Sequence, residues 1–302
     1  KGGVGGGWDE AEVVIRAAGK FQAPVPLVES ILAGWLLSRA GLEMPGGMLS
    51  IAPVRRDEAV SITRESGGQF RVTGELTRVP WGRTVAHLVV QGQCDGAPYV
   101  ALVPSSAWEV VAEDSNIAAE PRDSLCLDGM AVAAGPLPDP DDPVDFFAFG
   151  ALARAGQIAG ALESVLEQTV QYANDRTQFG KPIGKFQAIQ QELARMAGEV
   201  AAAGAAVEAA SRAADKRGND AGFEIAVAKI RASEAASIVA GITHQTHGAI
   251  GFTYEHRLHF ATRRLWSWRA EFGSETYWAE ALGRDLAGKG AQALWPDMVG
   301  RN

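Results

Sequence analysis

The spacing of apolar residues divides the chain into stretches with different periods. Residues 8–19 and 24–41 repeat apolar side chains at helical spacing, and each segment ends at a glycine that can close a helix. From residue 49 to about residue 135 the period falls to two, as in Gln69-Phe-Arg-Val-Thr-Gly, and Asp95-Gly96 between two apolar runs predicts a hairpin turn. The middle of the chain is therefore expected to be mostly antiparallel β.

A connector rich in proline and aspartate, residues 136–143, separates this middle from the last stretch. Beyond it the helical period returns almost to the end, with one apolar stripe over residues 158–170, a second over 189–200 and an alanine-rich segment over 223–242. Alanines let helices approach closely, so the pattern predicts an antiparallel bundle. We therefore expect an α+β fold with a short, truncated N-terminal helical region over 1–48, a middle β-domain over 49–143 and a C-terminal helical bundle over 144–302.

Composition narrows the class of protein. The chain has 302 residues, of which 47% are hydrophobic and 21% charged, as is usual for a soluble globular protein. A net charge of −8 opposes non-specific binding to nucleic acid, and no apolar run reaches the roughly 18 residues of a membrane span. Cys94 and Cys126 lack the spacing of a metal site or a disulfide framework, so we expect no metal centre and a reducing, cytoplasmic location.

Two passages in the helical part carry candidate chemistry. The first, Asp175-Arg176-Thr177-Gln178-Phe179-Gly180-Lys181-Pro182-Ile183, lies at a break between helices and can offer a planar cation and backbone donors to a phosphate. The second, His244-Gln245-Thr246-His247-Gly248-Ala249-Ile250-Gly251-Phe252-Thr253, ends a long helix in two glycines that let the backbone approach a ligand. On spacing alone, each passage indicates an anion site and no particular function.

In content and order these passages resemble the signatures of the acyl-CoA dehydrogenases. Arg176-Thr-Gln-Phe-Gly-Lys-Pro-Ile, Phe186-Gln-Ala-Ile-Gln and Gln245-Thr-His-Gly-Ala-Ile-Gly-Phe-Thr follow one another as in the C-terminal domain of that family. Gly2-Gly-Val-Gly-Gly-Gly and Ala23-Pro-Val-Pro-Leu-Val-Glu-Ser extend the resemblance to the first helices. The resemblance implies an acyl-CoA dehydrogenase-like fold, with short N-terminal helices, a middle antiparallel β-barrel and a C-terminal four-helix-type bundle.

The resemblance also implies FAD as cofactor and roles for particular residues. Arg176 would contact the FAD pyrophosphate, usually that of the neighbouring subunit, and Gln178 and Phe179 would line the same cofactor. The adenosine half would be held by Gln245, Gly248, Ala249 and Gly251. In the implied reaction a glutamate removes the α-proton of an acyl-CoA substrate while the β-hydrogen leaves as hydride to the flavin, and the electrons pass to an electron-transfer flavoprotein.

Two histidines beside the second passage raise the question of a metal. His244 and His247 lie three residues apart on a predicted helix, but no acidic ligand accompanies them in the sequence. We therefore expect both imidazoles to pack or to contact the cofactor rather than to bind a metal ion.

The β-domain departs from the family pattern. Members open it with a Thr-Glu-Pro-x-x-Gly-Ser-Asp type loop that holds the flavin ring, whereas this chain has Met48-Leu-Ser-Ile-Ala-Pro-Val-Arg-Arg-Asp. The Trp-Ile-Thr-Asn stretch that covers the flavin is replaced by Thr77-Arg-Val-Pro-Trp-Gly-Arg. This asymmetry predicts a subunit of a heteromeric, heterotetrameric dehydrogenase that completes its FAD site with a companion subunit. A self-sufficient homo-oligomer and a non-catalytic structural subunit are the alternatives.

The catalytic base is the least defined position. The family's carboxylate lies in a Glu-Gly-Thr-Ser-like turn, and the corresponding stretch here is Arg269-Ala-Glu-Phe-Gly-Ser-Glu. Alignment without a gap places Phe272 in the position of the base, whereas a gap of one residue places Glu271 there. Glu271 is therefore the candidate base, and the self-sufficient alternative depends on it.

Overall fold

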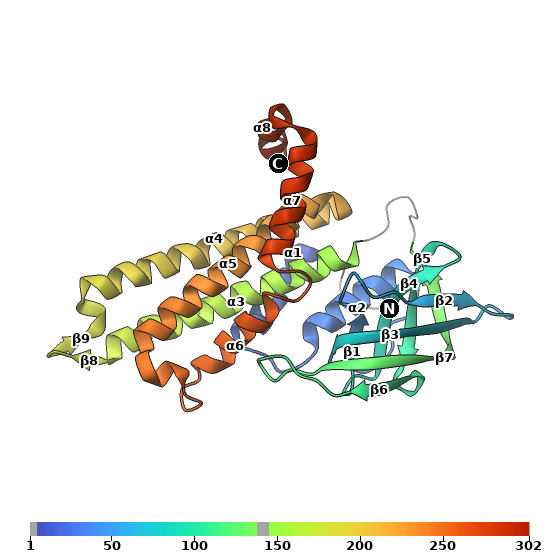
Figure 1. The fold of residues 1–302 in the computed structure, drawn as a ribbon, viewed down its shortest axis with the longest axis horizontal. Coiled ribbons are helices and arrows are strands. Elements are labelled where there is room, and N and C mark those ends of the chain that lie inside the picture. Colours follow the sequence, from blue (N-terminus) through green and yellow to red (C-terminus); the bar gives the residue numbers. More distant parts are fainter. Residues whose placement is uncertain (1–4, 138–144, 302) are drawn as a thin grey trace.

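A β-sheet domain occupies one end of the long axis and a helical bundle the other (Figure 1). The structure, a computed structural model, describes residues 5–137 and 145–301. The expected α+β architecture is confirmed. Most of the connector over 136–143 lies outside the described residues, and so do the first glycines of the chain.

Two N-terminal helices join the two ends of the molecule. Helix α1 (Trp8–Lys20) packs along the first bundle helix, and α2 (Leu27–Arg39) packs against the sheet. The approach of α1 to the bundle is very close because glycines lie at the crossing: a Cβ added to Gly19 would lie 2.0 Å from the Gln157 carbonyl oxygen, and one added to Gly160 would lie 1.9 Å from that of Arg16. No side chain could be inserted at this crossing without moving the helices apart.

The sheet closes into a small barrel. Its strand order is β1-β4-β2-β3-β7-β5, and β5 pairs back onto β4, while β6 extends the sheet from β7. Most pairs are antiparallel, as expected from the alternating pattern, but β4 pairs in parallel with β1 and β2, which alternation alone does not reveal. The predicted hairpin is present, with Asp95 at φ 51° and Gly96 at φ 81°. The strands are β1 (Leu49–Ala52), β2 (Ser61–Arg64), β3 (Phe70–Pro80), β4 (His87–Cys94), β5 (Ala97–Pro104), β6 (Trp108–Ala112) and β7 (Arg122–Pro136).

Three long helices form the body of the bundle and lie side by side in Figure 1: α3 (Phe146–Asp175), α4 (Gln187–Arg217) and α5 (Gly222–His247). The shorter α6 (Leu258–Trp268) packs against α3 and α5, and α7 (Glu275–Lys289) and α8 (Ala291–Val299) project from the bundle. Buried alanines line α3, α4 and α5, as the composition predicted. At the end far from the sheet, α3 and α4 are joined by a small hairpin of β8 (Thr177–Gln178) and β9 (Lys181–Pro182).

Short 3-10 turns complete the connections, at Ser105–Ala107, Ile183–Lys185, Gly218–Ala221 and Gly248–Phe252. Within the two described ranges, no helix combines the length and the apolar character that a membrane crossing requires. Cys94 and Cys126 are both free thiols.

Candidate functional site

The first passage with candidate chemistry forms the hairpin at the far end of the bundle. Helix α3 ends at Asp175, where the Arg176 N–H donates to the Tyr172 carbonyl oxygen at 2.9 Å. The Arg176 carbonyl then accepts from the Ile183 N–H at 2.8 Å, which closes the hairpin. Phe179 and Gly180 form its turn, with φ of 51° and 81°. The backbone geometry therefore directs this segment away from the core.

The side chains of this hairpin are open to solvent. Arg176, Gln178 and Phe179 are all exposed, and Phe179 keeps 92% of its surface accessible. Neither Arg176 nor Gln178 has a side-chain hydrogen bond or ion pair to another residue of the described chain. A bulky residue held at positive φ costs about 1–3 kcal/mol, and an exposed phenyl ring recovers none of it through burial. Such a feature is typical of a surface that meets a ligand or partner.

The second passage forms the turn between α5 and α6. Gly248 caps α5 with φ 63°, and a 3-10 turn follows over Gly248–Phe252. Gln245, Gly248 and Ala249 are exposed, whereas Gly251 is buried because its backbone approaches a neighbouring side chain. A Cβ on Gly251 would lie 2.8 Å from that of His247, so glycine is required for this close approach.

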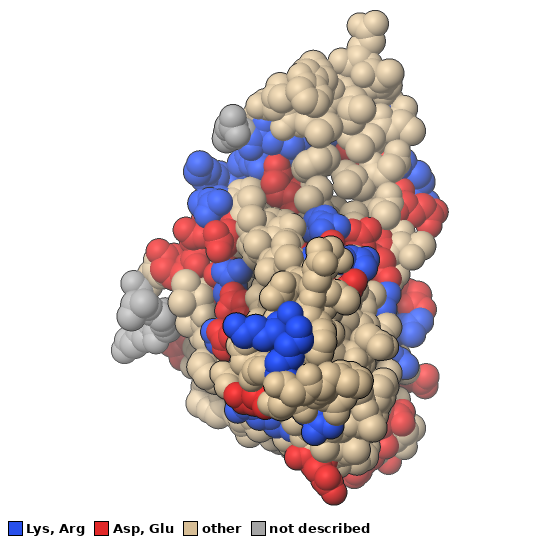
Figure 2. All heavy atoms as spheres, turned by 90° about the vertical axis from the view of Figure 1, so that its left-hand side faces the viewer, with Lys and Arg blue, Asp and Glu red and all other residues tan. Residues whose placement is uncertain are grey.

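The structure brings the two passages together at one end of the bundle. The Tyr172 ring, one turn before Arg176, stacks on His247 with ring centroids 4.3 Å apart, and its hydroxyl donates to the His247 carbonyl oxygen at 3.2 Å. Figure 2 looks onto this end and shows Lys and Arg side chains gathered near its middle. Exposed Arg176, Lys181 and Lys185 belong to this segment. We call this surface, formed by the hairpin and the Gln245–Gly251 turn, the bundle end.

The chemistry of the bundle end suits an extended anion with an attached ring system. A guanidinium can bind two phosphate oxygens, exposed amides can donate to or accept from a nucleoside, and an aromatic ring can cover one face. The φ of Gly248 and the absence of any heavy atom within 4 Å of its Cβ position leave open space beside the turn. The seven residues expected to hold FAD are therefore compatible with its ADP half, and that assignment stays a prediction.

The candidate base lies elsewhere, between the sheet and the bundle. The Glu271 carboxylate accepts from the Arg122 Nε at 2.8 Å and from the Arg154 Nε at 2.7 Å, and Asn116 donates to it at 3.3 Å. Only 18% of its side chain is exposed. Burial alone would raise the pKa of Glu271, but the charges and hydrogen bonds of the two arginines outweigh burial and hold the pKa at about 2.

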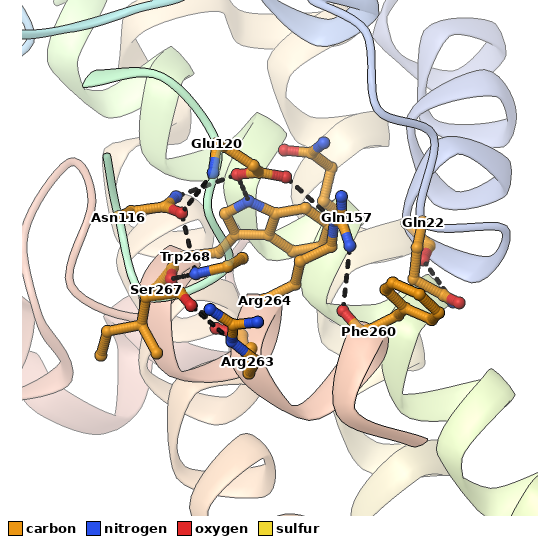
Figure 3. Close-up of polar contacts among 12 residues, drawn as sticks. Gln22, Asn116, Glu120, Gln157, Phe260, Arg263, Arg264, Ser267 and Trp268 are labelled. Atoms are coloured by element: carbon orange, nitrogen blue, oxygen red, sulfur yellow. Dashed lines mark hydrogen bonds and ion pairs between the residues drawn. The ribbon is translucent and has the colours of Figure 1, made fainter. Parts of the chain in front are cut away.

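This ion pairing continues into a chain of alternating charges. Figure 3 shows one part of it, where Glu120, on the connection between β6 and β7, faces Arg264 and Trp268 of α6. Apart from Glu271, each member has at most 7% of its side chain exposed. We call these six residues the buried ion chain. The closest oxygen–nitrogen distances between neighbours in it are Glu29–Arg154 at 2.6 Å, Arg154–Glu271 at 2.7 Å, Glu271–Arg122 at 2.8 Å, Arg122–Glu120 at 3.0 Å and Glu120–Arg264 at 2.9 Å.

The buried ion chain connects α2, α3, the sheet, α6 and the turn before α7. A general base works best with a pKa near the operating pH and an open path to the proton that it takes. A carboxylate shared by two guanidinium groups has neither, so the surroundings of Glu271 oppose its use as a base. The role expected for Glu271 stays a prediction that would require release from both arginines.

Phe272, the other candidate for the base's position, is fully enclosed. It is 3% exposed with φ 52°, and its ring packs edge-on against Phe146 and Phe147. A Cβ on Gly150 would lie 2.3 Å from the ring, so α3 provides a glycine to accommodate it. An apolar ring therefore occupies the turn where the family places its carboxylate.

Lys229 of α5 lies below the same turn. It is a buried lysine that the sequence analysis did not single out. Its Nζ donates to the carbonyl oxygens of Trp268 at 3.3 Å and Arg269 at 2.7 Å, so it caps the end of α6. Burial lowers the pKa of Lys229 to about 7, and the nearby Glu271 opposes this only in part. This lysine holds the turn that carries Glu271 and Phe272.

The sequence analysis also missed the other members of the buried ion chain, although the sequence contains a signal for two of them. Arg154 is the one charge in the apolar stretch 146–162, and Glu29 is the one charge in the apolar stretch 27–37. A lone charge on a helix that is otherwise apolar is buried only if it is paired. Arg122, Glu120 and Arg264 give no such signal, since polar residues surround them in the sequence.

A cavity of about 910 Å3 lies away from both regions, between α1, α2 and the end of α4. None of the predicted site residues lines it. At its edge the Asp215 carboxylate accepts the N–H groups of Trp8 and Asp9, the latter at 2.9 Å. The glycine-rich entry to α1 is therefore capped by an anion of the chain itself.

Comparison with known sequences finds similarity to the acyl-CoA dehydrogenases. A model of the acyl-CoA dehydrogenase C-terminal domain matches residues 143–286. The chain is 29% identical over 311 residues to the acyl-CoA dehydrogenase FadE27 of Mycobacterium tuberculosis, covering 95% of this chain and 83% of that protein. It is 28% identical over 264 residues to the acyl-CoA dehydrogenase IpdE2 of the same organism, covering 87% and 73%.

Solved structures agree over nearly the whole chain. One chain of the ChsE4-ChsE5 complex of Mycobacterium tuberculosis superposes with a TM-score of 0.84 at 27% identity, covering 94% of this chain and 82% of that one. A chain described as the Tcur3481-Tcur3483 steroid ACAD G363A variant gives a TM-score of 0.83 at 25% identity, covering 95% and 82%. The similarity therefore includes the barrel and the N-terminal helices as well as the bundle.

Proposed function

Since this chain belongs to the acyl-CoA dehydrogenase family of oxidoreductases, we propose that it is one subunit of an FAD-dependent acyl-CoA dehydrogenase. In this proposal its bundle end holds the ADP half of an FAD whose flavin ring lies against the β-domain of a companion subunit. The assembly oxidises an acyl-CoA thioester between Cα and Cβ and passes electrons to an electron-transfer flavoprotein.

The observation that carries the proposal is the separation of the bundle end from the chain's own sheet. The hairpin with Arg176 lies at the opposite end of the long axis from the β-domain (Figure 1). A cofactor held there cannot place its ring against that β-domain, because a bundle helix of 30 residues is about 45 Å long. A second chain must therefore supply the surface for the flavin ring.

Two relatives support a companion of a different sequence. The structural neighbours described as the ChsE4-ChsE5 complex and as Tcur3481-Tcur3483 each consist of two named components. In this chain the two flavin-binding loops of the β-domain also differ from the family pattern. Both facts favour a heteromer over a homo-oligomer.

The residues of the bundle end have separate tasks in this proposal. Arg176 binds the pyrophosphate with its guanidinium, and the backbone of the exposed Gly248 and Ala249 approaches the adenosine portion. Gln178 and Gln245 offer amide groups for hydrogen bonds, and Phe179 shields the bound group from water. When bound, FAD supplies the hydride acceptor for the reaction.

The sheet–bundle junction of this chain has a structural task. The buried ion chain fixes the barrel to the helices, and its carboxylates are all committed to arginines. The base that removes the α-proton is accordingly assigned to the companion subunit. A panel of short, medium and steroid side-chain CoA thioesters would identify the substrate, since one structural relative is described as a steroid enzyme.

Replacement of one arginine tests the proposal. Arg176→Ala should weaken FAD binding by the assembly on the order of 100-fold, because it removes a charged hydrogen-bond partner of the phosphate. Arg284→Ala, which removes an exposed arginine of α7, is the matched control and should leave the affinity unchanged. Unchanged FAD affinity and activity after Arg176→Ala would instead identify a structural subunit without a cofactor role.

A further inference from the structure

Tyr172 connects the two passages of the bundle end and belongs to neither: its backbone contacts the first and its side chain contacts the second. It lies near the end of α3, where its carbonyl oxygen accepts from the Arg176 N–H at 2.9 Å. Its ring stacks on His247 at 4.3 Å with an angle of 24° between the planes. Its hydroxyl donates to the carbonyl oxygen of the same histidine at 3.2 Å, directly before Gly248.

His247 is held so that it can receive this ring. It is 3% exposed, and its Nδ1 lies 2.9 Å from the Thr243 carbonyl oxygen, which makes Nδ1–H the donor and fixes the ring plane. Burial lowers the pKa of His247, with the neighbouring His256 and His244 adding to this, so the imidazole is uncharged at neutral pH. An uncharged ring stacks on tyrosine without being desolvated as a cation.

The end of the turn that leads into α6 is held by a third ring, that of His256, which packs against His247. His256 lies edge-on to His247 at 4.9 Å, and its Nδ1 accepts the Leu258 N–H at 3.2 Å, which fixes the start of α6. The turn Gly248–Phe252 is therefore anchored at both of its ends, and the Tyr172 side chain joins this anchor to α3, the helix that ends next to Arg176.

We propose that Tyr172 is a positioning residue for the cofactor, which fixes the distance between Arg176 and the Gly248–Phe252 turn. The pyrophosphate and the adenosine portion are covalently joined, so the protein groups that bind them must lie at a matching separation when FAD is bound. Holding the two segments together in advance removes the cost of ordering them when FAD binds. This inference rests on the proposed function, because it concerns the same cofactor.

Two substitutions divide the contacts of Tyr172. Tyr172→Phe keeps the stack and removes the hydroxyl, whereas Tyr172→Leu removes both. We expect the Kd for FAD of the assembly to rise roughly 3- to 10-fold in the first and roughly 10- to 100-fold in the second. Backbone amides of residues 248–252 should exchange hydrogen faster in both variants of the FAD-free chain. Tyr99→Phe, which removes a barrel hydroxyl that accepts from Arg64 at 2.7 Å, is the control and should change neither value.

A double-mutant cycle separates positioning from simple support of the fold. Arg176→Ala should cost fewer-fold in FAD affinity in the Tyr172→Leu background than in the parent, because the arginine is no longer held opposite the turn. Equal costs in both backgrounds would overturn the positioning role. If Tyr172→Leu does not fold, the same cycle with Tyr172→Phe decides.

The outcomes distinguish this inference from the proposed function. Loss of FAD affinity in Arg176→Ala together with unchanged affinity in both Tyr172 variants overturns the role of Tyr172 alone. Unchanged affinity in Arg176→Ala overturns the cofactor role of the bundle end, and the role of Tyr172 with it.

Discussion

At the bundle end, Arg176, Gln178 and Gln245 extend polar groups into solvent. At the sheet–bundle junction, by contrast, the Glu271 carboxylate is mostly buried and forms ion pairs with two arginines. The same family resemblance predicts a functional role for both regions. Their surroundings nevertheless differ in one physical respect: the charged groups of the junction are paired with one another, whereas the side chains of Arg176, Gln178 and Gln245 have no hydrogen bond or ion pair to the residues that the structure describes. Polar groups already paired within the fold stabilise it, whereas exposed groups on a strained turn are available to another molecule.

The two regions therefore place different demands on the fold. At the sheet–bundle junction three acids and three arginines are paired with one another in a largely buried position. A surface that binds a cofactor shared with a second chain, as proposed for the bundle end, must instead stay open in the isolated chain.

The largest effect is expected from breaking the buried ion chain at its centre. Arg154→Ala leaves the carboxylates of Glu29 and Glu271 buried without their shared partner. We expect the free energy of unfolding to fall by about 3–5 kcal/mol in urea titrations. The exposed pair of Arg284 and Glu280 provides the control, and Arg284→Ala should change the free energy of unfolding by less than about 0.5 kcal/mol. A similar small change in both variants would show that the junction is not the structural centre.

Glu271→Gln tests the two roles of this residue against each other. An amide cannot accept from both arginines, so we expect a loss of about 2 kcal/mol in the free energy of unfolding. In our account the FAD content and the turnover of the assembly stay close to those of the parent. If Glu271 is the base, turnover should instead fall by roughly 100- to 10,000-fold while flavin stays bound.

Acid should remove the contribution of Glu271 without any mutation. Its folded-state pKa of about 2 lies below the ordinary value of 4.5, so the stabilisation is fully present above pH 4.5 and is lost as the pH falls towards 2. The difference in unfolding free energy between the parent and Glu271→Gln should therefore narrow by about 1 kcal/mol per pH unit between pH 4.5 and pH 3. A constant difference over this range would mean that the carboxylate is not held by its arginines.

The smallest effect on stability is expected at the hairpin turn. Phe179→Gly removes an exposed ring and relieves the left-handed backbone, so the free energy of unfolding should change by no more than about 1 kcal/mol. The affinity of the assembly for FAD should nevertheless fall roughly threefold to tenfold, measured by flavin fluorescence. An unchanged affinity would remove Phe179 from the cofactor surface.

Much of the fold could be predicted because local patterns determine it. The change of period at residue 49, the Asp95-Gly96 turn and the alanine-rich stripes each correspond to an observed element. The parallel pairing of β4 with β1 and β2 could not be predicted, because alternation shows which face of a strand is buried and not which strand lies beside it.

The two regions differ in predictability for a similar reason. The bundle-end residues lie in two continuous motifs, so their order in the sequence was enough to select them. The other members of the buried ion chain come from four segments that are far apart in the sequence, and Arg122 lies 149 positions from Glu271. Only the folded chain shows that the candidate base has been placed among arginines.

The most direct test of the account is the number of flavins bound per chain. We would purify the chain alone and together with its companion dehydrogenase, and quantify FAD by absorbance after release from each sample. We expect the chain alone to bind almost no flavin and the assembly to carry one flavin for each pair of unlike chains. A full complement of one flavin per chain in the protein alone would contradict it.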